Sequence, residues 1–125
     1  MEPTVLMYNL PTASRTQVEL LCRELGAAAR NVEKPRQGLT LGALVGLLPE
    51  VPGGSQVPGE MLVMAYFDRD MLDDFLRGFR ARQIPPIPHK AMLTLTNTAW
   101  TGRELYESIS REMAAMEANR GREKS

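Results

Sequence analysis

The residues best suited to chemistry gather in one short stretch, Pro88 to Trp100, with the sequence PHKAMLTLTNTAW. A β-prone run there ends in hydroxyl and amide side chains and in the only tryptophan of the sequence. Such groups hydrogen-bond to a planar or polar small ligand and stack on it, but they are poorly suited to proton transfer. The stretch therefore predicts a ligand-binding edge without a catalytic residue.

Strands must bring such residues together, and four segments of the sequence are predicted to form them. Val5–Leu10 and Met61–Phe67 are almost entirely apolar, which is typical of strands buried on both faces. Ala28–Glu33 and Ala91–Thr96 mix polar and apolar residues, which indicates strands with one wetter face or at an edge of the sheet.

Helices with clear start signals lie between and after these strands. Ser14 and Gln17 form a predicted capping box for a first helix, which Gly26 should end. Asp68 is the predicted cap of a second helix, whose apolar stripe runs from Met71 to Phe79.

The last helix should begin at a capping box of Thr101 and Glu104, with Glu107 and Arg111 paired one turn apart. Its apolar side is predicted to contain Leu105, Ile109, Met113 and Met116. We expect the helix to fray after Glu117, which leaves residues 118–125 as a disordered tail.

The middle of the chain differs from these helices. Leu39–Leu48 is apolar nearly all round, and its Gly42 and Gly46 favour a short helix in close contact with a neighbour. Residues 49–60 are rich in proline and glycine, which predicts a surface loop. We expect residues 1–117 to form a single α/β domain that includes this loop.

The predicted order of elements is β-α-β-(α)-β-α-β-α. We favour an α/β fold with a parallel, doubly wound sheet of order 2-1-3-4, in which Leu39–Leu48 is the crossover between the second and third strands. The alternative is a ferredoxin-like α+β sandwich, in which strand four runs against strand one.

In the parallel arrangement the carboxyl ends of strands one, three and four meet at one edge, where open sheets bind ligands. The predicted ligand-binding residues are Asn9, Tyr66, Lys90, Thr94, Thr96, Asn97 and Trp100. The site fails if Asn9 and Asn97 lie at opposite ends of the sheet. The same threonines and asparagine also suit a turn and a helix cap, and Trp100 suits a core position, which is the interpretation that the sequence slightly favours.

Composition excludes several classes of function. Fifteen basic and fifteen acidic side chains cancel, which argues against binding to nucleic acid or to an anionic membrane surface. No segment approaches the roughly 18 apolar residues of a membrane span, and we expect a cytoplasmic protein. The single Cys22 cannot form an internal disulfide and lacks neighbours for a zinc site, so we expect neither a metal nor a cofactor.

Several segments, in order, resemble a bacterial family called domain of unknown function 3783 (DUF3783). The resemblance rests on VLMYNLP, on LTLGALVGL and on the chain from Glu60 to Glu112. Its strongest part is the pattern K-A-x-L-T-x-T-N-x-x-W that begins at Lys90. The resemblance implies an α/β fold, and it carries no established activity, cofactor or catalytic residue. His89 and Leu95 depart from the family pattern, which more often has an apolar residue and a proline there.

We therefore expect a non-enzymatic module that binds a small ligand or a protein. One alternative is a small enzyme that uses Lys90, His89 or Cys22 in a polar cleft. Another is a structural subunit that pairs with a second copy through residues 39–48.

Overall fold

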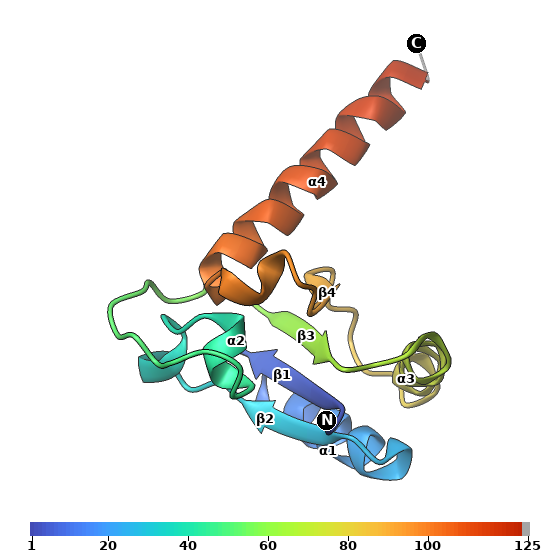
Figure 1. Cartoon of the computed structure of the whole chain (residues 1–125). Helices are drawn as coiled ribbons and strands as arrows, with labels where there is room; N and C mark the ends of the chain where they lie inside the picture. Colours follow the sequence, from blue (N-terminus) through green and yellow to red (C-terminus); the bar gives the residue numbers. More distant parts are fainter. Residues whose placement is uncertain (124–125) are drawn as a thin grey trace.

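The structure, a computed structural model, describes residues 1–123, with side chains as far as Gly121. Its sheet has the order β2-β1-β3-β4, as the sequence predicted, and the α/β class is confirmed (Figure 1). The strands are β1 (Thr4–Tyr8), β2 (Ala28–Asn31), β3 (Met61–Ala65) and β4 (Lys90–Met92). The helices are α1 (Thr12–Leu25), α2 (Leu41–Leu44), α3 (Arg69–Ala81) and α4 (Gly102–Glu123), with short 3-10 helices η1 (Lys34–Arg36) and η2 (Asn97–Ala99).

The direction of the strands differs from the prediction. β1 is parallel to β2 and β3 is parallel to β4, but β1 and β3 are antiparallel, with Tyr8 opposite Met61 and Thr4 opposite Ala65. The sheet is therefore mixed, and the predicted all-parallel, doubly wound arrangement is wrong. The ferredoxin-like alternative is also wrong, because the two parallel strands of each β-α-β unit are direct neighbours instead of being split by another strand.

The connection between β2 and β3 explains this direction. A parallel connection needs a crossover of about a dozen residues, usually a helix. The predicted crossover at 39–48 contains only the four-residue α2, after which Gly46 has a left-handed φ of 82°. The chain consequently returns to the end of the sheet that it left, and β3 must start beside the end of β1.

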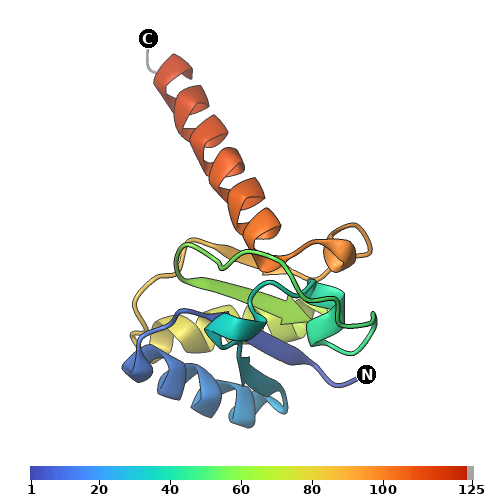
Figure 2. The same ribbon diagram turned by 90° about the vertical axis from the view of Figure 1, so that its left-hand side faces the viewer.

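The two central strands are buried on both faces, as predicted. Val5 and Met7 of β1 face α1 and α3, whereas Leu6 and Tyr8 face the opposite layer, and β3 alternates in the same way. The opposite layer consists of α2, part of the 49–60 loop and the start of α4 (Figure 2). The predicted pairing surface at 39–48 is mostly part of this core, and only Leu47 and Leu48 are exposed apolar residues there.

Two of the three predicted helix starts are confirmed. The Asp68 carboxylate accepts from the Met71 N–H, and Thr101 and Glu104 cap each other's N–H groups. The predicted capping box at Ser14 is wrong, because α1 starts at Thr12 after Pro11 and buries Ser14 in its first turn. Proline pre-forms the first turn but has no side-chain oxygen to cap it.

β4 is shorter than predicted, because the Asn97 side chain folds the chain back on itself. Asn97 Oδ1 accepts from the Thr94 N–H at 2.8 Å, and Asn97 Nδ2 donates to the Met92 carbonyl at 3.0 Å. The strand therefore ends at Met92, and residues 94–96 are exposed outside the sheet.

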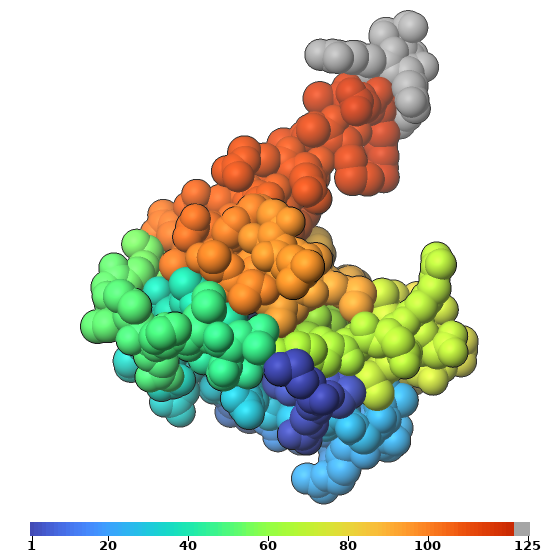
Figure 3. Space-filling model, viewed as in Figure 1, coloured from blue at the N-terminus to red at the C-terminus, as the bar shows by residue number. Residues whose placement is uncertain are grey.

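α4 stands out from the body of the molecule (Figures 1 and 3). Leu105 is buried and Ile109 is partly buried, but Met113 and Met116 lie beyond the core and are exposed. The helix does not end at Glu117 and continues to Glu123, so that residues 118–123 of the expected disordered tail are helical, while residues 124–125 lie outside the described part.

Two side-chain amides tie the 49–60 loop to the strands. The buried Gln37 donates from Nε2 to Asn9 Oδ1 at 2.9 Å and to the Val32 carbonyl at 3.2 Å, and its Oε1 accepts from the Val57 N–H. Asn9 Nδ2 donates to the carbonyls of Val57 and Gly59. We call Asn9 and Gln37, with these backbone partners, the amide clip.

Replacing Gln37 by leucine should lower the free energy of unfolding by about 2–4 kcal/mol, because the substitution leaves buried partners in the clip unpaired. Urea denaturation measures this loss. The control is Gln56→Leu, an exposed glutamine of the same loop, which should change stability by less than about 0.5 kcal/mol. Equal effects of the two substitutions would contradict a stabilising clip.

Cys22 lies in the core beneath the sheet, where burial and then the charge of Glu19 raise the pKa of its thiol to about 12. At pH 8 only about one thiol in ten thousand is then ionised, against roughly one in ten at the ordinary pKa of 9.0. We expect iodoacetamide to alkylate Cys22 about a thousandfold more slowly in the native protein than in urea. Comparable rates in the two conditions would show an accessible, reactive thiol.

Candidate functional site

The predicted ligand-binding residues do not all meet at one edge. Because β3 and β4 run against β1, their carboxyl ends lie at the end of the sheet opposite to Asn9. Asn97 is hydrogen-bonded to Met92 at that opposite end. Asn9 and Asn97 therefore lie at opposite ends of the sheet, which is the condition under which the predicted site fails. The expected convergence of these residues is wrong.

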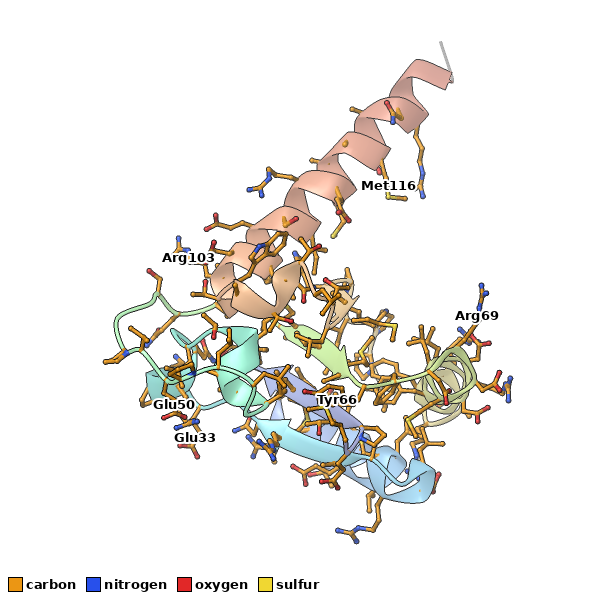
Figure 4. The ribbon with its side chains drawn as sticks, viewed as in Figure 1. Glu33, Glu50, Tyr66, Arg69, Arg103 and Met116 are labelled. Carbon is orange, nitrogen blue, oxygen red and sulfur yellow. The ribbon has the colours of Figure 1, made fainter. Side chains whose placement is uncertain are left out.

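Tyr66 follows β3 at the end of the sheet away from Asn9. Figure 4 shows Tyr66 far from Arg103, which lines the same cavity as Asn9. It has a left-handed φ of 62°, and its hydroxyl is buried without a hydrogen-bond partner in the described part of the chain. With Thr4 and Arg30 it lines a small cavity of about 150 Å³. Lys90 begins β4 beside Leu62 and is partly buried.

Thr94, Thr96 and Asn97 belong to the turn after β4, which supports the structural interpretation of these residues. Thr94 Oγ1 accepts from the Asn97 N–H, and Thr98 Oγ1 donates to the Thr94 carbonyl at 2.6 Å. Thr94 and Thr96 are exposed. Ligand binding by these residues stays a prediction.

The chain after this turn comes back to the end of β1. Leu41 N–H donates to the Trp100 carbonyl, and Thr101 forms a β-bridge with Thr40. The next residue, Gly102, lies so close to Tyr8 that a Cβ atom would be 2.8 Å from the ring. Arg103 is consequently brought to the end of β1 where Asn9 lies.

The largest cavity among those described lies at this end of β1 and measures about 700 Å³. It lies between the end of β1, η1, the 49–60 loop and α4. Its lining residues are Asn9, Leu10, Lys34, Gln56, Val57, Pro58 and Arg103. We call it the basic cavity, because two of these described residues are cationic and none is acidic.

The backbone beside the basic cavity adds positive potential. α1 begins two residues after Leu10, and its first turn holds neither an acidic residue nor a side-chain cap from Pro11. The free N–H groups and the dipole at such a helix start favour anions. Arg103 lies in the first turn of α4, where the helix dipole disfavours a cation, and its Nε donates to Glu107 Oε1 at 2.8 Å. The predicted pair of Glu107 with Arg111 is therefore replaced by a pair with Arg103.

Trp100 lines a second cavity of about 360 Å³, which we call the Trp100 cavity. Its other lining residues are Glu104, Glu107 and Arg111 on α4. The tryptophan is partly buried against the core on the α2 and α4 side of the sheet, which we call the upper core. The prediction of a core role therefore holds in part.

His89 anchors the base of α4. Its ring stacks on Tyr106 with centroids 3.8 Å apart and an interplanar angle of 5°, and its Nε2 lies 2.9 Å from Ser110 Oγ. Nucleophilic catalysis by this pair would need a third group to orient the imidazole. Among the described residues no carboxylate is hydrogen-bonded to His89, and the contact is best explained as packing of α4 onto the body.

Sequence reasoning named Asn9 and Trp100, each of which lines a cavity, but it did not name Gln37, Lys34, Gln56 or Arg103. A lone glutamine in KPRQG has no spacing that distinguishes it, and Lys34 and Arg103 are ordinary charges 69 residues apart. The one usable signal was Arg103, because a cation two residues after the capping-box Thr101 opposes the dipole of the helix that starts there.

Burial lowers the pKa of His89, the only histidine of the sequence, below its ordinary 6.5. The unfolded chain therefore binds the proton more readily, and the free energy of unfolding should fall as pH drops through about 6.5. We expect His89→Phe, which keeps an aromatic ring but does not titrate, to remove this decrease between pH 7 and pH 5 in urea denaturation. The same pH profile in both proteins would contradict a partly buried imidazole that disfavours its charged form.

No helix in the described residues is long and apolar enough to cross a bilayer, and no three of their His, Cys, Asp or Glu side chains group as metal ligands.

Comparison with known proteins identifies one family. The chain matches none of the curated proteins and none of the solved structures compared with it. Residues 60–116 match the model of a family described as a domain of unknown function, and they hold β3, α3, β4, η2 and most of α4. The segments VLMYNLP and LTLGALVGL lie outside the matched residues. Residues 60–116, somewhat less than half of the chain, are thus similar to the family DUF3783, domain of unknown function 3783.

Proposed function

We propose that this protein is a non-enzymatic module that binds a small anionic ligand in the basic cavity. The observation that carries the proposal is that Lys34 and Arg103 both line a cavity of about 700 Å³. The described lining of this cavity contains no carboxylate. A cavity of this volume lies within the usual size range of small-molecule sites. Phosphate or carboxylate groups are the natural partners of two such cations.

The surroundings of the cavity support a preformed site. The amide clip holds Asn9 and the backbone of Val57 in place, so that these two walls need not reorganise on binding. The Arg103–Glu107 pair is about half exposed on both sides, and pairs of this kind contribute less than about 1 kcal/mol. An incoming anion can therefore take Arg103 from Glu107 at low cost.

A cytoplasmic location is part of this proposal. It is supported by the single cysteine, which is buried as a free thiol, as expected in a reducing compartment.

Isothermal titration with pyrophosphate, ADP and citrate at low ionic strength tests the proposal. We expect saturable binding of at least one of these anions, and we expect Lys34→Gln and Arg103→Gln each to weaken it about three- to tenfold. Added salt should weaken binding further, because the cavity is open to solvent.

The matched control is Arg69→Gln, which removes the same charge at the distant start of α3 (Figure 4). It should leave the affinity unchanged. Equal loss in the Arg69 variant would show nonspecific charge attraction, and the absence of binding at millimolar anion would overturn the proposed function.

A further inference from the structure

The Trp100 cavity adjoins the basic cavity but has a net negative lining. An indole ring, the carboxylates of Glu104 and Glu107 and one guanidinium, that of Arg111, line it. A guanidinium group is planar, stacks on tryptophan and donates two parallel hydrogen bonds to carboxylates. We propose that the Trp100 cavity binds a ligand that bears a guanidinium group.

The backbone of Trp100 is fixed on both sides. Its backbone N–H donates to the Asn97 carbonyl at 3.0 Å, and its carbonyl accepts from the Leu41 backbone N–H at 2.8 Å. Its ring packs partly on the upper core while it still lines the cavity. Little conformational entropy is then lost when a cation stacks on the ring.

The ion pair of Arg103 with Glu107 links the two cavities. Arg103 lines the basic cavity, Glu107 lines the Trp100 cavity, and Arg103 Nε lies 2.8 Å from Glu107 Oε1. A cation that takes Glu107 releases Arg103, and an anion that takes Arg103 releases Glu107. The two ligands therefore bind with positive coupling, because the internal pair is broken only once.

The size of this coupling follows from the pair that is lost. An exposed pair one helical turn apart supports a mutual gain in affinity of about two- to fivefold, or roughly 0.4–1 kcal/mol. The coupling rests on the proposed anion site, whereas the guanidinium site does not. Arg111 also lines the Trp100 cavity, where its positive charge repels a cationic ligand, so Arg111→Gln should tighten cation binding.

The fluorescence of Trp100, the only tryptophan, reports on its cavity directly. Titration of the full chain with N-acetyl-L-argininamide should give a saturable change that the neutral urea analogue N-acetyl-L-citrullinamide does not give. Agmatine serves as a second probe. Equal affinity for agmatine identifies a free guanidinium compound, and preference for the argininamide identifies an arginine side chain, as the natural source of the same group.

Two variants should have opposite effects on the two sites. Glu107→Gln should weaken argininamide binding at least fivefold and tighten pyrophosphate binding, whereas Arg103→Gln should do the reverse. The control Glu112→Gln removes an exposed carboxylate further along α4 and should change neither affinity. A merely structural ion pair would move both affinities in the same direction, which would overturn the proposal.

Argininamide and pyrophosphate are each titrated alone and then together, so that the two proposals fail separately. No saturable change with argininamide alone overturns the guanidinium site, whatever pyrophosphate does. Binding of both ligands with unchanged affinity in each other's presence overturns the coupling.

Discussion

The antiparallel pairing of β1 with β3 is the constraint on which the rest of the structure depends. It places the carboxyl ends of the two β-α-β units at opposite ends of one sheet. Each unit keeps its helix on the same face, where α1 and α3 pack together over the lower core. The other face is left for the irregular connection between β2 and β3 and for the start of α4.

That irregular connection would be mobile without specific ties, because it contains one short helical turn and a loop rich in proline and glycine. The amide clip supplies those ties through two side chains that satisfy several buried backbone groups. Gly38 and Gly54 permit a further close approach, because a Cβ atom on either would collide with the backbone of the other. The wall of the basic cavity is therefore a loop that is held by hydrogen bonds and close packing.

Charge at the base of α4 is arranged in a way that net composition conceals. The chain has no net charge, yet Lys34 and Arg103 share one cavity and two carboxylates share the next with Trp100. The exposed Arg103–Glu107 pair lies between them and holds both groups at little cost in energy. Local separation of charge, and not overall charge, therefore sets the electrostatic potential in these two cavities.

The sequence by itself determined the local structure. Apolar runs identified the two strands buried on both faces, the side chains of Asp68, Thr101 and Glu104 identified two helix starts, and strand order followed from which strands were most apolar. These features depend on neighbours within a few residues or on burial alone. The misplaced start of α1 shows the limit, because Pro11 and Ser14 both suit a first turn and only packing selects between them.

Only the tertiary structure decided the direction of β3 and the composition of the cavities. Strand direction depends on whether the connection between β2 and β3 crosses the sheet, and the apolar pattern of 39–48 is equally compatible with a crossover and with the short buried turn that is found. The basic cavity joins residues from β1, η1, a loop and α4, which are up to 94 positions apart between Asn9 and Arg103. No local pattern encodes such a meeting, because it depends on long-range pairing and on the path of the chain after β4.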